Sequence, residues 1–301
     1  MVVKDRSLSS RIFSFIVHVS MLSIIAVTLL PLLHITSASL SGQTAVLGGS
    51  VGLFPKDFNL SAYRLVFSTD SIPRAFRNSV FIMVFGTFFN MALTITMAYA
   101  LSITTLPFKR FFLVLITITM FFSGGLIPSF LLVRSLGMYN TFAALVVPGG
   151  ISTWNLIVMR TFFQSSPKEL KESAYLEGAG EIAVLVKIVL PLSTAIIATI
   201  SLYYAVGHWN DWFSSLIYLY DSKKYPLPMM LRELIMENRV WEYLMEARQT
   251  ELAAIEFGDQ KVSPESLKYA VIVISFVPML VLYPFLQRYF LKGVMVGSLK
   301  G

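Results

Sequence analysis

Residues 166–192 read SPKELKESAYLEGAGEIAVLVKIVLPL, a charged segment between two apolar runs of membrane length. Ser166, Pro167 and Glu169 have the pattern of a helix start, in which serine caps the helix, proline takes the first helical position and glutamate completes a capping box. Charged and apolar side chains then alternate, as on a surface helix with one packing face. Gly178 ends this helix, because glycine allows the backbone to turn. The stretch predicts a short amphipathic helix with a glycine elbow, which is typical of a docking element for a soluble partner.

The composition is that of an integral membrane protein. Of the 301 residues, 55% are hydrophobic and 14% are charged, and the mean hydropathy is +0.70, whereas soluble domains average about 25% charged residues. The net charge of +7 does not indicate nucleic acid binding, because Lys and Arg flank the apolar runs and form no dense patch with aromatic residues. The absence of Cys excludes disulfides and thiolate metal sites, and no other metal site is indicated.

Six charge-free runs are long enough to cross a bilayer, which takes about 20 residues. We expect transmembrane spans at about 12–35, 78–104, 111–133, 141–163, 184–208 and 269–291. They would form one all-α transmembrane domain over residues 1–301. We place a cytoplasmic loop at 164–183 and extracytoplasmic loops at 36–75 and 209–267.

The basic residues near the N-terminus indicate the orientation. Lys4, Arg6 and Arg11 precede the first span, and no further Lys or Arg occurs before Lys56. The positive-inside rule therefore predicts a cytoplasmic N-terminus, and six spans return the C-terminus to the same side. The first apolar run exceeds the roughly 7–15 residues of a signal-peptide core, so we interpret it as an uncleaved anchor.

Three spaced motifs carry a family resemblance. Glu172-Ser173-Ala174 is followed by Glu177-Gly178-Ala179 and then by Ile188-Val189-Leu190-Pro191. This order resembles the EAA loop of permease subunits of binding-protein-dependent ABC importers, which usually reads E-A-A-x-x-D-G-A with I-x-L-P after it. The chain departs from that pattern conservatively at Ser173, Glu177 and Ala195.

Other segments resemble the MalG-like carbohydrate permeases of that family. They are Asn78-Ser79, Trp209-Asn210-Asp211-Trp212, and the ending from Gln287-Arg288-Tyr289-Phe290 through Gly293 and Gly297 to Lys300-Gly301. The resemblance covers roughly residues 60–301. It implies the fold of an ABC type I importer permease, with six transmembrane helices and a cytoplasmic EAA-type coupling helix, in the bacterial cytoplasmic (inner) membrane.

The resemblance also implies partners and coupling residues. The chain would pair with a homologous second permease as a heterodimer, with two ATP-binding subunits and an extracytoplasmic solute-binding protein. The coupling residues would be Glu172, Ala174, Glu177, Gly178 and Ala179, with Glu172 forming a salt bridge to the ATPase and the alanines filling a groove. Because the chain has no P-loop, ATP and Mg would bind the partner, and the chain itself is not expected to be an enzyme.

Polar residues within or next to the spans are candidates for the substrate pathway, because such groups usually face the bundle interior. They are Asn90, Tyr99, Trp154, Asn155, Trp209, Asn210 and Asp211. Aromatic faces with amide and carboxylate groups suit a sugar. For Trp209 and Trp212 the aromatic belt of the membrane interface is the alternative. Pro148-Gly149-Gly150 is expected to kink the fourth span, and broken helices often line translocation paths.

The subfamily resembled implies an oligosaccharide substrate, including acidic ones such as alginate fragments. An acidic substrate would favour cations in the path, and the candidates are Arg74, Arg77 and Arg134. The residues 231–257, LRELIMENRVWEYLMEARQTELAAIEF, predict an outer helix that either covers the spans or receives the binding protein. An ion-coupled secondary transporter is the competing class, but it predicts intramembrane acidic residues or paired repeats, which the sequence lacks. A membrane-embedded enzyme lacks a nucleophile, base and metal set.

Overall fold

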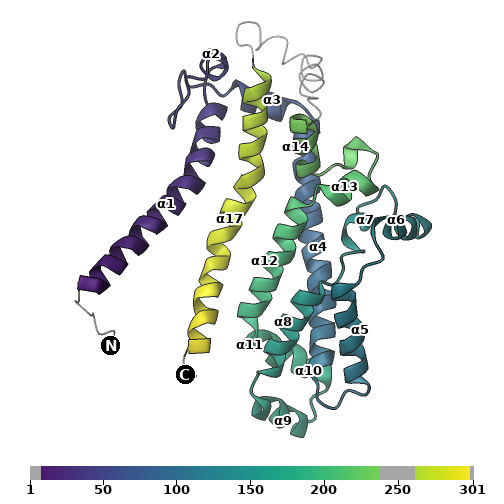
Figure 1. Cartoon of the computed structure of the whole chain (residues 1–301). Helices are drawn as coiled ribbons and strands as arrows, with labels where there is room; N and C mark the ends of the chain where they lie inside the picture. The colour runs from purple at the N-terminus through teal and green to yellow at the C-terminus, as the bar shows by residue number, and fades with distance from the viewer. Residues whose placement is uncertain (1–7, 237–261, 299–301) are drawn as a thin grey trace. The chain divides into compact units, whose positions relative to one another are not determined.

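The computed structural model describes residues 8–236 and 262–298, and within them every regular element is helical. Contacts divide the chain into two compact units. One comprises Met1–Ile72 and Leu234–Ser275, and the other comprises Pro73–Glu233 and Phe276–Gly301. Each unit is described here by itself, and Figure 1 labels its helices.

The helices of the described residues follow one another along the chain. They are α1 (Leu8–Ser39), α2 (Gln43–Leu47), α3 (Ser61–Ser68), α4 (Ser71–Ser102), α5 (Lys109–Phe121), α6 (Leu126–Ser135), α7 (Ala143–Val146), α8 (Thr153–Gln164), α9 (Lys168–Leu176), α10 (Glu181–Val184), the π-helix η1 (Leu185–Val189), α11 (Leu190–Leu192), α12 (Thr194–Asn210), α13 (Phe213–Tyr218), the 3-10 helix η2 (Ser222–Lys224), α14 (Leu227–Met236) and α17 (Pro264–Ser298).

Three helical stretches are long and apolar enough to cross a membrane unbroken: Leu8–Ser39, Ser71–Ser102 and Pro264–Pro284. Two more expected spans are bent pairs. The α5–α6 pair bends by 115°, and the pair from Glu181–Leu192 to α12 bends by 85°. The described residues therefore provide three such helices, or up to five with each bent pair as one span.

Local backbone features account for the breaks. Gly125 has φ +86°, a conformation that favours glycine, between α5 and α6. Ser193 leaves helical geometry between α11 and α12, with φ −107° and ψ 16°. Residues 141–163, expected as one span, form α7 and α8 on either side of Pro148-Gly149-Gly150, so the expected kink is a full break. A proline and two glycines weaken a helix at that point.

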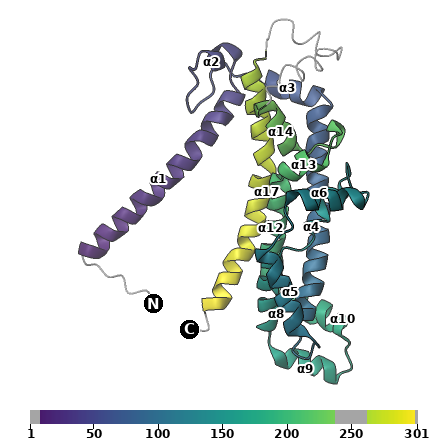
Figure 2. The same ribbon diagram turned by 45° about the vertical axis from the view of Figure 1, so that its right-hand side comes forward.

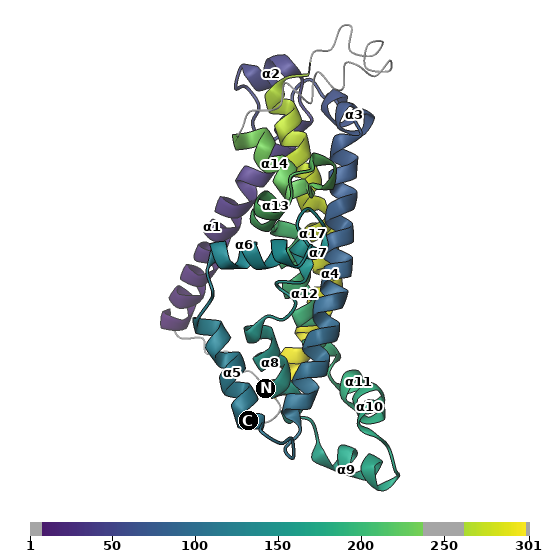
Figure 3. The ribbon, with the colours of Figure 1, turned by 90° about the vertical axis from the view of Figure 1, so that its right-hand side faces the viewer.

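The second unit is built around α4. Figures 1 and 2 show α5, α8 and α10 gathered along its lower half with α9 below them, and Figure 3 shows α6 running roughly perpendicular to α4. A buried cluster that includes Tyr99, Leu156, Met159, Phe163 and Ile200 joins α4, α8 and α12. This core holds the lower end of the bundle, where residues 164–183 emerge.

Cations stabilise the C-terminal end of α4. The Arg160 guanidinium Nε donates to the Leu101 carbonyl at 3.1 Å, and Lys109 Nζ donates to the Ile103 carbonyl at 2.8 Å. The last carbonyls of a helix have no partner within the helix and carry partial negative charge, so basic side chains suit them. These bonds fix the lower end of α4 against α5 and α8.

Polar side chains fasten the segment 219–227, which leads into α14. Asn78 Nδ2 donates to the carbonyls of Lys223 at 2.9 Å and Tyr225 at 3.1 Å, and Ser79 Oγ accepts from the Leu227 N–H at 2.7 Å. The Asn78-Ser79 motif therefore anchors the start of α14. Residues 237–257 of the expected outer helix lie outside the described residues, as do Lys300 and Gly301 of the expected C-terminal motif.

The first unit contains a smaller packed cluster. Ala38 at the end of α1 packs with Ala45 and Val51, and Tyr269 of α17 lies against them. The Ser39 and Tyr63 hydroxyls form a hydrogen bond of 2.7 Å, which ties α1 to α3.

Candidate functional site

The helix of the 164–183 loop begins later than the sequence predicts. α9 starts at Lys168, its N-cap is Pro167 with ψ 125°, and no side-chain cap hydrogen bond forms. The predicted Ser166 cap and its capping box with Glu169 are therefore wrong. Since Pro167 has a non-helical ψ, Ser166 stands one residue too far from the first free N–H groups of the helix.

The predicted glycine elbow is confirmed, and it is a Schellman motif. Gly178 has φ +81°. Its N–H donates to the Tyr175 carbonyl at 3.0 Å, and the Ala179 N–H donates to the Ala174 carbonyl at 2.9 Å. This pair of bonds requires a left-handed residue at the turn, which glycine adopts without strain.

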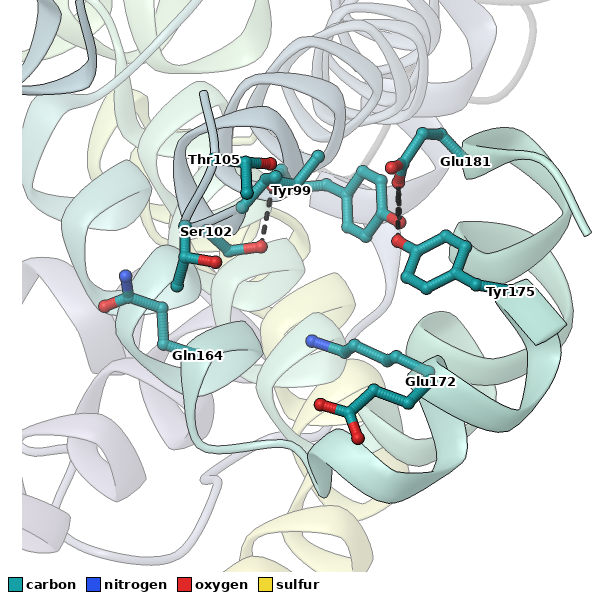
Figure 4. Close-up of a pocket in the computed structure, with 10 residues that line it drawn as sticks. Tyr99, Ser102, Thr105, Gln164, Glu172, Tyr175 and Glu181 are labelled. Carbon is teal, nitrogen blue, oxygen red and sulfur yellow. Dashed lines mark hydrogen bonds between the residues drawn. The ribbon is translucent and has the colours of Figure 1, made fainter. Parts of the chain in front are cut away.

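A carboxylate ties the loop to α4. Tyr99 of α4 donates its hydroxyl to Glu181 Oε2 at 2.6 Å, and Tyr175 of α9 donates to the same oxygen at 2.9 Å. Figure 4 shows the two rings converging on Glu181 from opposite elements. Burial, opposed by the hydrogen bond with Tyr99 and reinforced by Glu181, raises the pKa of the Tyr175 phenol, so this hydroxyl remains a donor at neutral pH.

The carboxylate cluster borders a pocket of about 510 Å³, which we call the loop pocket. It is lined by Tyr99, Ser102, Ile103, Thr104, Thr105, Gln164, Lys171, Glu172, Tyr175 and Glu181. Lys171 Nζ donates to the Phe163 carbonyl at 3.0 Å. Desolvation lowers the pKa of this ammonium, and Glu181 opposes the shift. The loop is therefore attached both to α4 and to the end of α8.

The five predicted coupling residues fall into two sets. Glu172, Glu177 and Gly178 are exposed, and Figure 4 shows the Glu172 carboxylate pointing away from Glu181. Ala174 and Ala179 are half-buried and pack against the core of this chain. The two alanines are therefore packed within this chain. The exposed surface of the loop carries the carboxylates of Glu172 and Glu177.

Two apolar side chains share the exposed surface of the loop. Leu176 is 90% exposed and Ile182 is 80% exposed. They flank the glycine elbow in sequence, and exposed apolar residues beside charged ones are typical of interaction sites. Sequence reasoning missed these two residues and Glu181, although the alternation of charged and apolar residues in α9 was a usable signal for Leu176.

A second cavity lies where α7 and α8 separate, and we call it the break cavity. Its volume is about 530 Å³. It is lined by Asn90, Ser129, Ala144, Leu145, Pro148, Gly149, Ser152, Asn155, Tyr203, Tyr204, Gly207, His208, Asp211, Ser214 and Tyr218. The cavity brings together three of the predicted pathway residues, Asn90, Asn155 and Asp211.

The other four predicted pathway residues lie elsewhere. Tyr99 belongs to the loop pocket, and Trp154 is 60% exposed. Trp209 is only 2% exposed and packs edge-on against Phe76 with ring centroids 5.8 Å apart, so it is a core residue rather than a belt residue. Asn210 is exposed at the end of α12 and does not line the break cavity.

Side chains from α4 and α12 hold the break open. Asn90 Nδ2 donates to the carbonyls of Gly149 at 2.7 Å and Gly150 at 2.9 Å. His208 Nε2 lies 2.7 Å from Asn90 Oδ1. Because the Asn90 amide nitrogen is the donor to both carbonyls, Oδ1 accepts and His208 carries its hydrogen on Nε2. Sequence reasoning identified Asn90 but missed His208 as its partner.

Comparisons with known proteins fit this geometry. No protein-family model matches the chain. It is 39% identical over 295 residues to the polygalacturonan/rhamnogalacturonan transport system permease protein YtcP of Bacillus subtilis (strain 168), covering 98% of this chain and 100% of that relative. It is 42% identical over 277 residues to protein LplC of the same organism, covering 92% of this chain and 90% of LplC.

A solved structure is also similar. It is a crystal structure of a bacterial ABC transporter involved in the import of the acidic polysaccharide alginate. One of its chains matches this chain with a TM-score of 0.85 and 31% sequence identity, covering 94% of this chain and 98% of that chain.

The chain therefore belongs to the family of ABC transporter permease subunits, in its MalG-like carbohydrate group. It is a multi-pass inner-membrane protein. It acts as an importer permease and is not itself an enzyme, because ATP hydrolysis in this family takes place on a separate subunit. Family membership also implies an ATPase and a solute-binding protein as partners, and it favours this assignment over an ion-coupled secondary transporter.

Proposed function

We propose that the chain is one of two homologous permease subunits of an importer that moves an oligosaccharide from its solute-binding protein to the cytoplasm by alternating access. Two copies of the ATPase would bind ATP and Mg. The polygalacturonan/rhamnogalacturonan permease and the alginate importer support a polysaccharide fragment as cargo, with acidic fragments among the candidates.

The proposal includes a single transmembrane domain over residues 1–301 with six spans and both termini in the cytoplasm. In this topology α1, α4, the α5–α6 pair, α7 with α8, α10 to α12, and α17 each provide one span. The loops 36–75 and 209–267 would be extracytoplasmic, and the 164–183 loop would be the cytoplasmic EAA-type coupling element. The basic residues Lys4, Arg6 and Arg11 support this orientation.

One observation carries the coupling role: the exposed loop is firmly attached to the bundle that it would move. Glu181 joins Tyr175 of the loop to Tyr99 of α4, while Glu172, Leu176 and Ile182 remain exposed. The side chain of Glu172 would form a salt bridge with a basic residue of the ATPase. Gly178 would let the ATPase approach the backbone closely, since it has no side chain and its surface is open, with no described residue within 4 Å of where a Cβ would lie. Closure of the ATPase pair would then pull α4 together with the loop.

Purification of the tagged chain from membranes tests the assembly. We expect a second permease and an ATPase to copurify, with ATPase activity that rises when the loaded binding protein is added. A chain that purifies alone, without ATPase activity and with ion-dependent uptake in vesicles, would contradict the proposal.

The variant Glu172→Ala tests the docking residue. Removing one partner of a hydrogen-bonded interface charge pair costs about 2–5 kcal/mol, so we expect uptake to be uncoupled from ATP hydrolysis while the chain remains folded. Glu169→Ala, on the same helix and also exposed, is the matched control and should retain transport. Wild-type transport by Glu172→Ala would exclude this role.

A further inference from the structure

We propose that the break cavity binds one uncharged, hydroxyl-rich sugar unit of the cargo, so that this subunit contributes its own saccharide site to the path. The inference rests on the proposed import function and deepens it. The break cavity is distinct from the loop pocket, with which it shares no lining residue.

Asn90 and Tyr204, which themselves line the cavity, stabilise the helix break, and other polar groups of the wall remain available for a ligand. The Asn90 side-chain amide donates hydrogen bonds to the Gly149 and Gly150 carbonyls. The Ser152 N–H donates to the Tyr204 hydroxyl at 2.9 Å, and that hydroxyl also lies 2.8 Å from Thr94 Oγ1. The Gly149 and Gly150 carbonyls and the Ser152 N–H therefore have protein partners and do not need a ligand.

Buried polar side chains on the cavity wall have no such partner. Asn155 is 6% exposed, and its side-chain amide makes no hydrogen bond to any described residue. Tyr218 is 8% exposed, and over the same residues its hydroxyl also makes none. Both line the cavity. Neither the Asn155 amide atoms nor the Tyr218 hydroxyl is among the fully buried, unbonded side-chain atoms of the described residues, so both groups reach the open space of the cavity and can bond a ligand there.

Asp211 and Tyr203 add further groups of the cavity wall that could contact a sugar. Asp211 accepts from the Ser214 N–H at 3.0 Å through Oδ1, while its Oδ2 has no hydrogen-bond partner within 8–236 and 262–298. The side chain of Tyr203 is 52% exposed, which leaves part of its ring free for the C–H face of a sugar. The amide and phenol groups both donate and accept, and the carboxylate accepts, so together they suit the hydroxyls of a sugar.

The charged residues that line the break cavity disfavour an acidic sugar such as a uronate. No Lys or Arg occurs among the described residues that line the cavity, and Asp211 supplies a carboxylate. Arg74, Arg77 and Arg134, the candidate cations of the sequence, do not line it. The Nε2 of His208 already bonds Asn90. A uronate here would place two carboxylates together without a counter-ion, which is unfavourable in a desolvated site.

The size also fits a ligand of this class. The cavity volume of about 530 Å³ lies within the roughly 300–1,000 Å³ of small-molecule sites. Such sites combine apolar walls with a few placed polar groups, as Ala144, Leu145 and Pro148 combine with Asn155 and Tyr218 here. If the cargo carries uronate units, the geometry assigns their carboxylates to positions outside this cavity.

Binding to the purified complex of both permeases and the ATPase, without binding protein, tests the site. The probes are radiolabelled galactotriose as the neutral saccharide and trigalacturonate as the acidic competitor, measured by equilibrium dialysis. We expect saturable galactotriose binding, at least tenfold weaker displacement by trigalacturonate, and at least tenfold weaker galactotriose binding in Asn155→Leu and Tyr218→Phe. Tyr220→Phe, at an exposed tyrosine outside the cavity, is the matched control and should bind as wild type.

The variants separate a ligand-binding role from a structural one. Asn155→Leu replaces an amide that makes no side-chain hydrogen bond in the described chain, so its melting temperature should equal or exceed that of wild type while binding falls. The proposal is overturned by absent saturable binding, by equal binding in both variants, or by equal competition from trigalacturonate. ATPase stimulation by loaded binding protein, recorded in the same preparation, shows separately whether the import function itself holds.

Discussion

Gly86 of α4 packs directly against His208 of α12. A Cβ at Gly86 would lie 2.6 Å from His208 Nε2, the nitrogen that bonds Asn90. We expect Gly86→Ala to destabilise the chain by about 1–3 kcal/mol, as overpacked cores do. Gly207→Ala is the matched control, because its Cβ would meet no described residue within 4 Å. Thermal unfolding in detergent should separate the two, and equal melting temperatures would contradict the close packing.

Glu181 offers a second test, of how the loop is attached. Glu181→Gln keeps the shape but removes the charge that two tyrosine hydroxyls share, and hydrogen bonds to charged groups contribute about 1.5–3 kcal/mol. We expect faster hydrogen exchange across residues 168–184 in the assembled complex, and less uptake per ATP hydrolysed. Glu169→Gln should leave both unchanged. Unaltered exchange in Glu181→Gln would show that the loop is held by other contacts.

The turn at Asn140, just before α7, is hydrogen-bonded to the segment that follows α13. Asn140 has φ +60°, its N–H donates to the Tyr218 carbonyl at 2.8 Å, and its Oδ1 accepts from the N–H groups of Tyr220 and Asp221 at 3.3 and 3.2 Å. The residue therefore combines a left-handed backbone with two side-chain bonds.

These two properties can be separated by substitution. Asn140→Gly keeps the backbone conformation and loses the side-chain bonds, whereas Asn140→Ala loses the bonds and also adds the strain of a left-handed residue, about 1–2 kcal/mol. We expect stability to fall in the order wild type, Gly, Ala, measured by unfolding in detergent. A glycine variant less stable than the alanine variant would contradict this account of the turn.

Elements also show how far the sequence predicts this fold. The three unbroken helices α1, α4 and α17 follow from long apolar runs, because apolar length alone decides whether a helix can span. A kink at Pro148-Gly149-Gly150 is predicted because these residues weaken a helix directly, and the structure has a full break there. The bends at Gly125 and Ser193 are not predicted. Hydropathy carries no information on the direction of a helix axis, and single glycines or serines are common in membrane helices.

The sequence likewise predicts some features of the 164–183 loop and the break cavity and not others. Spaced motifs identified the 164–183 loop, and its elbow at Gly178 could be read from the glycine itself. The partner of each polar residue could not be read from the sequence. Asn90 meets Gly149 and His208, and Glu181 meets Tyr99, only after helices distant in sequence have packed. For that reason Ser166 was assigned a cap that local sequence favours and the folded loop does not form.

The α5–α6 pair is little covered by the rest of this chain. The 13 residues of α5 extend about 20 Å at 1.5 Å per residue, which is short of the roughly 30 Å hydrocarbon core. No residue of α5 is buried in this chain, and α6 buries only Val133. The helix ends around Gly125 would therefore place unpaired backbone groups against lipid unless another protein covers them.

This bend links the folding of the chain to its biosynthesis. In the two-permease importer that we propose, a subunit made without the second permease would leave the uncovered helix ends at Gly125 in the bilayer, where the chain would be exposed to quality-control proteases. We expect pulse-chase labelling to show a half-life several-fold shorter when the chain is expressed alone than when it is expressed with the partner permease, while coexpression of the ATPase alone should not restore it. Equal half-lives would show that lipid alone tolerates the bend. The rate at which one subunit is synthesised would then set how much of the other survives.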